Sequence, residues 1–177
     1  MKHETKKKFK ELALLDELTR TRNRRSISVF AQKAMDAARE KNSPLCFAMI
    51  DVDHFKQFND RFGHDVGDEV LVLVADELSK ELRQTDALGR WGGEEWLIVL
   101  PNSSSDVMSG VFERIQARLR TLKLSMEGAP PISVSMGCTD YHSSDASLEA
   151  IIKRADEALY RAKELGRNRC EIKLLTS

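Results

Sequence analysis

The stretch GRWGGEEWLIVLPN, residues 89 to 102, predicts a β-hairpin and so limits the kind of sheet that the chain can form. The apolar run 96–100 has the length and composition of a buried strand, and the pair Gly92-Gly93 is a strong turn signal. Glu94 and Glu95 then lie at the hairpin tip, although glutamate is not among the preferred turn residues. On this stretch alone, a solvated turn and a site that needs paired carboxylates both stay open.

Length and composition indicate one soluble domain. The chain has 177 residues, 41% of them hydrophobic, which is enough for a single core. Its longest uninterrupted apolar runs, 45–50 and 70–75, have six residues each, whereas a helix that crosses a bilayer needs about 20. No charged segment followed by an apolar stretch marks the start of the chain for secretion. We therefore expect a cytoplasmic domain without a membrane span.

The cysteines are odd in number and lie in apolar, strand-like surroundings at Cys46, Cys138 and Cys170. This pattern argues against a disulfide framework and against a zinc site. We interpret the three side chains as reduced thiols in the core.

The N-terminal segment is basic, although the formal net charge of the chain is zero. Residues 1–25 carry nine Lys or Arg against four Asp or Glu. Such an arm can bind nucleic acid or an anionic membrane. We favour a solvated helix over residues 1–15 and no nucleic-acid partner, because an apolar stripe lies among the charges without interleaved aromatic residues. The stripe consists of Phe9, Leu12, Leu15 and Leu18.

The remaining chain alternates between helical and strand-like periodicity. Helices are expected at 26–41, 55–62, 111–122 and 148–165, and strands at 45–52, 132–136 and 170–175. Strands that alternate with helices, together with a direct hairpin, predict an α/β fold with a central mixed or antiparallel sheet flanked by helices.

Two local details are also predicted. Asp65 or Asp68 is expected to cap a further helix whose inner face ends at Leu82. In the strand 132–136, apolar residues alternate with serines, which is typical of a strand with one buried face.

Two acids end the strand 45–52 and suggest a cation site. Asp51 and Asp53 are at i and i+2, so their side chains point to the same face. Like charges at short range repel unless a cation joins them, and Mg2+ is commonly held by one or two carboxylates with substrate phosphates. The alternative is that both acids only cap the next helix. The acids would converge with Glu94 and Glu95 if their strands were neighbours.

Phosphate binding would need an unusual apparatus, because neither a P-loop nor a G-x-G-x-x-G stretch followed by a helix is present. Metal, amides after Asp53, and cations at Lys56, Lys163 or Arg167 are the remaining candidates. Each cation, taken alone, also fits a solvated side chain.

Three blocks resemble the signatures of the GGDEF family, the diguanylate cyclases. They are DVDHFKQFNDRFGHDVGDEVL at 51–71, RWGGEEW at 90–96 and ALYRAKELGRNR at 158–169, and DELTRTRNRR at 16–25 is similar to the segment that opens the family's domain. The resemblance implies a core like that of class III nucleotide cyclases and polymerase palms over residues 16–177. It also implies that residues 1–15 are the end of a signalling linker from an upstream sensory domain in a bacterial protein.

The resemblance further implies an activity and its cofactors. Two GTP would be condensed into cyclic di-GMP and pyrophosphate across a homodimer, with two Mg2+ or Mn2+ ions per active site. The metal ligands would be Asp51, the carbonyl of Val52 and Glu94. Glu95 would lie beside the reacting 3′-hydroxyl, and Lys56 would assist as a catalytic cation.

Substrate and inhibitor residues are carried over by position. The guanine edge would be bound by Asn59 and Asp68, and its face by Leu71. The phosphates would be held by Lys56, Lys163, Arg167 and the amides near His54 and Phe55. Room for the nucleotide would be left by Gly92 and Gly93, which lack side chains. Arg83 and Asp86 match the family's R-x-x-D product-inhibition site, which Arg90 would assist. The alternative for Arg83 and Asp86 is a plain ion pair.

Two departures from the family pattern stand out. Trp96 replaces the final Phe of the signature and is expected to be a core anchor. Arg20-Thr21-Arg22 stands where the family has glycine, leucine and a variable residue, so Thr21 bears on guanine affinity. The rival interpretation of the whole chain is a weakly active or inactive GGDEF module that binds GTP or cyclic di-GMP.

Overall fold

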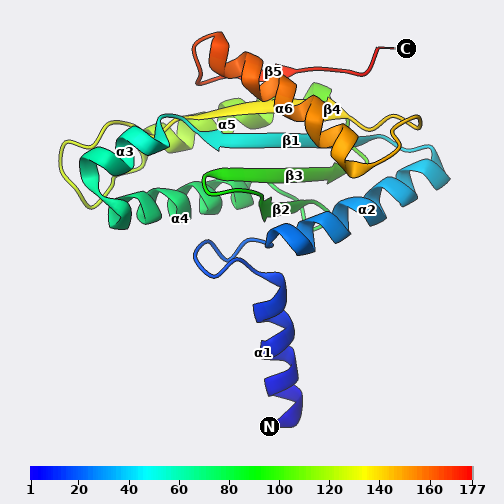
Figure 1. Cartoon of the computed structure of the whole chain (residues 1–177), viewed down its shortest axis with the longest axis horizontal. Helices are drawn as coiled ribbons and strands as arrows, with labels where there is room; N and C mark the ends of the chain where they lie inside the picture. Colours follow the sequence, from blue (N-terminus) through cyan, green and yellow to red (C-terminus); the bar gives the residue numbers. More distant parts are fainter. Residues whose placement is uncertain (177) are drawn as a thin grey trace.

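The central strand β1, Leu45–Val52, lies in the middle of a five-stranded sheet with the order β2-β3-β1-β4-β5. The other strands are β2 (Ala87–Arg90), β3 (Glu95–Pro101), β4 (Val134–Asp140) and β5 (Cys170–Ile172). All neighbours pair antiparallel except β4 and β5, which are parallel. The computed structural model describes residues 1–176, and it confirms the mixed sheet and the hairpin between β2 and β3 (Figure 1).

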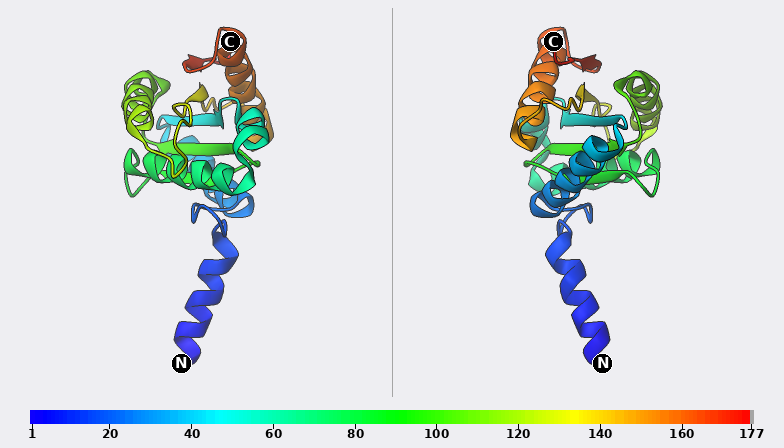
Figure 2. Two further views of the ribbon diagram at one scale, coloured as in Figure 1. Left: turned by 90° about the vertical axis from the view of Figure 1, so that its left-hand side faces the viewer. Right: turned by 90° about the vertical axis from the view of Figure 1, so that its right-hand side faces the viewer.

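Helices cover both faces of this sheet, as Figure 2 shows for α5 and α6 on opposite sides. The helices are α1 (Lys2–Leu14), α2 (Arg24–Lys41), α3 (Phe55–Phe62), α4 (His64–Lys80), α5 (Met108–Thr121) and α6 (Leu148–Glu164), with a short 3-10 turn at Ser105–Val107. Alternate residues of β1 enter two cores: Ala48 and Ile50 pack on the side of α4 and α5, whereas Phe47 and Met49 pack on the side of α2 and α6. Trp96 is fully buried, as expected of a core anchor.

The expectation of a half-exposed β4 is wrong, because helices cover both of its faces. Six of its seven residues are buried, and the strand begins at Val134 rather than at residue 132. Its polar side chains are buried with partners: Ser135 Oγ donates to Asp53 Oδ1 (2.6 Å), and Thr139 Oγ1 accepts from Arg154 Nε (2.6 Å). Serines in such a strand therefore indicate internal hydrogen bonds and not solvent.

Helix α6 lies unusually close to β4 at Gly137. A Cβ atom at this position would lie 2.2 Å from the backbone N of Leu159 and 2.3 Å from the carbonyl O of Ala155. Only glycine fits this approach, and it fixes the height of α6 above the sheet. The carboxyl-terminal end of α6 carries Lys163, so this contact also positions a predicted site residue.

The turn between α3 and α4 corrects one sequence prediction. Gly63 has a φ of 89° and lies at the boundary of both helices, so α4 already begins at His64. Asp65 lies in the first turn and Asp68 within the helix, and neither caps it. A glycine that ends one helix and starts the next leaves no separate capping position.

Helix α1 projects away from the sheet (Figures 1 and 2). It ends at Leu14, so the predicted apolar stripe is wrong at Leu15 and Leu18; the side chain of Leu12 lies outside the described residues. Asn23 links the two helices, because its side chain donates to Ala13 O (3.0 Å) and accepts from the Ser26 amide at the start of α2. Among the described residues, no helix is long and apolar enough to cross a membrane.

Candidate active site

The hairpin tip and the end of β1 lie side by side at one edge of the sheet. Because β1 and β3 are neighbours, Asp51 is the cross-strand partner of Glu95. The amide of Val52 donates to Glu94 O (3.2 Å), and the amides of Trp91 and Gly92 both donate to the carbonyl of Glu95 (2.8 and 3.3 Å). The condition for the two acidic segments to converge is therefore met.

Asp51 is the most buried acid of this edge, with 7% of its surface exposed. Its Oδ2 accepts from Lys163 Nζ on α6, whereas its Oδ1 is buried without a hydrogen-bond partner in the part of the chain that the structure describes. Burial raises the pKa of Asp51; Lys163 opposes this rise, and Glu94 and Asp53 add to it. A buried carboxylate oxygen that lacks a donor is what a hard cation would satisfy.

The residues at this edge fit a divalent metal. Asp51 and Glu94 supply carboxylates beside the backbone of Val52, and Lys163 supplies a positive charge at the same place. Among the described residues, no group of three or more His, Cys, Asp or Glu is arranged to hold a metal ion. A site with two carboxylates would depend on carbonyl oxygen and on the phosphates of a ligand, as Mg2+ sites commonly do.

Glu95 is held in a half-buried position that disfavours its charge. Its pKa is raised, first by burial and then by the neighbouring Asp51 and Asp156. Burial also raises the pKa of Asp156, on α6, against the effect of Lys163. Sequence reasoning missed Asp156; its position seven residues before Lys163 on an amphipathic helix is the signal that both point toward the hairpin.

Asp53 does not share the role proposed for Asp51. Its carboxylate accepts from Ser133 Oγ (2.7 Å), from Ser135 Oγ (2.6 Å) and from the amide of Asn168 (3.1 Å). These donors occupy both oxygens, so the sequence interpretation of Asp51 and Asp53 as one cation pair is corrected. Asp53 instead ties the end of β1 to β4 and to the loop after α6.

The predicted phosphate ligands surround the carboxyl end of β1. His54 has a φ of 56° and turns the chain directly into α3, so that the first amides of this helix, from Phe55, lie beside the strand end. Lys56 is exposed in the first turn of the same helix. Arg167 lies in the loop after α6, which the hydrogen bond from Asn168 to Asp53 holds against β1.

The predicted guanine ligands lie on α3 and α4. Asn59 Oδ1 is buried and lacks a hydrogen-bond partner among the described residues. Its side chain lies against Gly67, where a Cβ atom would come within 1.7 Å of Asn59 Oδ1. Asp68 is exposed one residue further along α4, and Leu71 is buried in the core beneath. Gly67 is a second residue that sequence reasoning missed.

Arg83 and Asp86 face each other at the far end of β2. Two hydrogen bonds join the side chains (3.2 and 3.1 Å), and Arg83 also donates to Pro101 O (2.9 Å) and Ser103 Oγ (2.8 Å). Asp86 raises the pKa of Arg83. The guanidinium remains largely accessible, with 55% of its side chain exposed.

Arg90 does not join this pair, contrary to expectation. It lies at the opposite end of β2, where it donates to both oxygens of Asp16 (3.2 and 3.1 Å) and to the carbonyl of Gly93 (3.1 and 2.8 Å). Burial alone would raise the pKa of Asp16, but hydrogen bonds from Thr19 and Arg90 outweigh it and lower the pKa. Arg90 thus ties the segment after α1 to the glycine turn.

The segment 20–22 departs from the family pattern without disturbing the fold. Arg20 adopts a φ of 61°, a left-handed conformation that favours the glycine found there in the family. Thr21 is buried, and its hydroxyl shares a hydrogen bond of 2.9 Å with Thr19 Oγ1.

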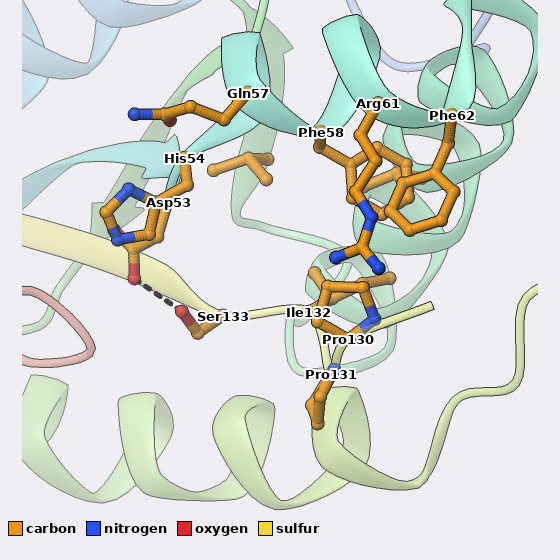
Figure 3. A pocket seen from close by; sticks show the side chains of 12 residues that line it. Asp53, His54, Gln57, Phe58, Arg61, Phe62, Pro130, Pro131, Ile132 and Ser133 are labelled. Atoms are coloured by element: carbon orange, nitrogen blue, oxygen red, sulfur yellow. Dashed lines mark hydrogen bonds between the residues drawn. The ribbon is translucent and has the colours of Figure 1, made fainter. Parts of the chain in front are cut away.

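A separate cavity of about 200 Å³ lies beside α3 (Figure 3). Phe58, Phe62, Pro130 and Ile132 give it a mostly apolar wall, and Arg61 points toward the prolines. Val52 and His54 are members of the predicted site that also take part in its lining.

A palm-like sheet with an acidic edge beside a glycine turn defines the class of nucleotide-handling α/β domains. The model of the family described as "Diguanylate cyclase, GGDEF domain" matches residues 13–169, and the chain belongs to this family. Diguanylate cyclase DgcP of Pseudomonas aeruginosa is 40% identical over 164 residues, which are 92% of this chain and 24% of DgcP. The chain thus spans about a quarter of that relative.

Solved structures agree with the family. The coiled coil and GGDEF domain of DgcB from Caulobacter crescentus in complex with c-di-GMP aligns with a TM-score of 0.90 at 29% identity, covering 97% of this chain and 91% of that one. The active GGEEF domain of a diguanylate cyclase from Vibrio cholerae aligns with a TM-score of 0.80 at 36% identity, covering 87% and 98%.

Proposed function

We propose that residues 16–177 form the catalytic domain of a diguanylate cyclase, which condenses two GTP into cyclic di-GMP and releases two pyrophosphates. The observation that carries the proposal is the buried Oδ1 of Asp51, beside Glu94 and Glu95, which has no hydrogen-bond partner among the described residues. A structural domain has no need of acids in this arrangement, because each buried charge costs folding free energy.

Asp51, the carbonyl of Val52 and Glu94 are the proposed ligands of two Mg2+ or Mn2+ ions. Bound metal would supply charge neutralisation on the phosphates and on the attacking and leaving oxygens. Lys163 would move from its partner Asp51 toward the phosphates of the substrate, since a divalent ion would replace it as the counter-charge. Gly92 and Gly93 leave the hairpin tip open, and at Gly93 an added Cβ would meet nothing within 4 Å.

The remaining groups bind and orient GTP. Asp68 would accept hydrogen bonds from the guanine edge above Leu71, where the Asn59 amide can both donate and accept. The amides at His54 and Phe55, with Lys56 and Arg167, would hold the phosphates. The raised pKa of Glu95 suits a group that takes the proton of the 3′-hydroxyl, because such a base works best when its pKa approaches the working pH.

Catalysis would require a second copy of the chain. Each half-site carries a single GTP, so each 3′-hydroxyl must attack the α-phosphate held by the partner across a two-fold axis. Helix α1 would continue into the linker from a sensory domain. The pair Arg83 and Asp86, of which Arg83 is exposed, would bind cyclic di-GMP as an inhibitor, a role that suits the planar guanidinium.

The test is to incubate the chain with GTP and Mg2+ at several protein concentrations and to separate the nucleotides by chromatography. Cyclic di-GMP should form at a rate that rises faster than linearly with protein, and Asp51→Asn should abolish it. Asp36→Asn, on the exposed face of α2, is the matched control and should leave the rate unchanged. GTP binding without product at any concentration would instead favour a regulatory module.

A further inference from the structure

Two thiols lie next to each other at the edge of the sheet, away from the proposed active site. The Sγ atoms of Cys138 on β4 and Cys170 on β5 are 3.5 Å apart. The strands are parallel and Cys170 is the partner of Met136, so the two cysteines are diagonal neighbours on the same face. Cys138 is fully buried, whereas Cys170 is half-buried.

Cys170 faces a polar pocket of about 540 Å³ between β5 and α5. Arg120 and Arg169 line this pocket against a single acid, Glu113, together with the side chain of Gln116. A thiol that is partly exposed among arginines is the setting in which cysteine reacts as a thiolate. The pocket is therefore a route by which a small polar oxidant reaches the sulfur.

The two sulfurs are unlike in acidity. The hydrogen bond from Cys138 lowers the pKa of Cys170, against the effects of burial and of Glu171. The same contact raises the pKa of Cys138, and burial adds to this rise. The third thiol, Cys46 on β1, is fully buried, and burial raises its pKa as well. Cys46 is thus an internal reference for an inert core cysteine.

We propose that Cys138 and Cys170 are an oxidisable pair that forms a reversible disulfide when a hydroperoxide enters the pocket at Cys170. The Cys170 thiolate attacks the peroxide O–O bond and becomes a sulfenic acid, while the other oxygen leaves as water or an alcohol. Cys138 then attacks that sulfur, the S–S bond forms, and the sulfenic oxygen leaves as water with the thiol proton. In total, two thiols lose two electrons and two protons, and the peroxide gains them.

Formation of this bond must move β5. A disulfide needs its sulfurs at about 2.05 Å, so the two Sγ atoms must approach each other from 3.5 Å. Within the described part of the chain, the three residues of β5 pair only with β4, so this edge strand is the part that must move. The loop with Arg167 directly precedes it, and oxidation should therefore weaken the grip on phosphates. This consequence rests on the proposed function; the bond itself does not.

The bond is tested on the full chain with hydrogen peroxide, followed by intact mass and peptide mapping under non-reducing conditions. We expect a mass lower by two hydrogen atoms and a Cys138–Cys170 peptide that dithiothreitol separates again. Cys46→Ser should give the same product at the same rate. Cys138→Ser should stop at a sulfenic acid on Cys170, which dimedone traps, and Arg120→Gln should slow the reaction several-fold.

Two results would overturn the proposal. One is a folded protein, verified by circular dichroism, in which peroxide leaves both thiols free. The other is oxidation in which Cys46 reacts as readily as Cys170. Neither result depends on GTP turnover. For the consequence at the loop, the KM for GTP should rise several-fold on oxidation and return with dithiothreitol, and an unchanged KM in fully oxidised protein would refute the coupling to Arg167.

Discussion

Replacing Gly67 by alanine should weaken GTP binding by displacing Asn59, although Gly67 itself is not a proposed GTP ligand. The added Cβ would lie 1.7 Å from Asn59 Oδ1, whereas ordinary contact begins near 3.4 Å, so the amide must move by about the difference. A displaced amide loses its hydrogen bond to guanine and leaves polar groups unpaired, which costs about 1–3 kcal/mol. That range corresponds to a loss of affinity of about 5- to 150-fold.

The assay is calorimetric binding of a non-hydrolysable GTP analogue, combined with thermal melting. Gly110→Ala is the matched control, because it is also a helical glycine and an added Cβ would lie 3.5 Å from its nearest neighbour, the flexible end of the Arg114 side chain. It should leave binding unchanged and, by helix propensity, stabilise the protein by up to about 1 kcal/mol.

A double-mutant cycle then separates the mechanism from a general loss of structure. If Gly67→Ala acts through Asn59, it should cost almost nothing once Asn59→Ala has removed the amide. An equal loss of affinity in both backgrounds would refute the reasoning, since the helix packing itself would then be the cause.

Three further changes have distinct expected results. Gly137→Ala should destabilise the fold by about 3 kcal/mol, because its Cβ would meet backbone that cannot rotate away, and urea unfolding measures this loss. The lowered pKa of Asp16 means that its carboxylate stabilises the fold above the ordinary value of 3.8 and that this contribution disappears as the pH falls through the folded value. Asp16→Asn should therefore flatten the dependence of Tm on pH below pH 3.8, and an unchanged slope would show that the contacts of Asp16 with Thr19 and Arg90 have no such effect. The raised pKa of Glu95 should place the acid limb of kcat above pH 4.5, and a pH profile that falls only below this value would contradict its role as a base.

Much of the fold follows from local patterns in the sequence. The apolar run of β1 and the double glycine before β3 each determine an element by periodicity and turn chemistry alone, and the direct hairpin already excludes a fully parallel sheet. The errors arise where tertiary contacts decide. Ser133 and Ser135 look solvent-facing until Asp53 accepts their hydrogen bonds, and Asp65 looks like a cap until Gly63 takes that place.

The candidate site likewise combines residues that local patterns indicate with contacts that only the tertiary structure determines. Asp51, Glu94 and Glu95 could be selected from residue type and spacing, but their proximity depends on β1 and β3 being neighbours, which no local pattern states. Arg90 and Asp16 are 74 residues apart in the sequence, and Gly67 touches Asn59 at a single point where α3 packs on α4. Such contacts carry no periodic signal, and they emerge only from the assembled chain.

The ion pair between Asp51 and Lys163 spans 112 residues of sequence. Closing a segment of that length costs roughly 4 kcal/mol of chain entropy. The ion pair alone cannot offset this cost, so the packing of the completed sheet must do so. A ribosome would therefore have to finish α6 before this edge could assemble, and a nascent chain that ends earlier would hold Asp51 without its counter-charge. Assembly of the acidic edge is in this sense a late step of folding, and the proposed GTP site would be complete only after α6 has docked.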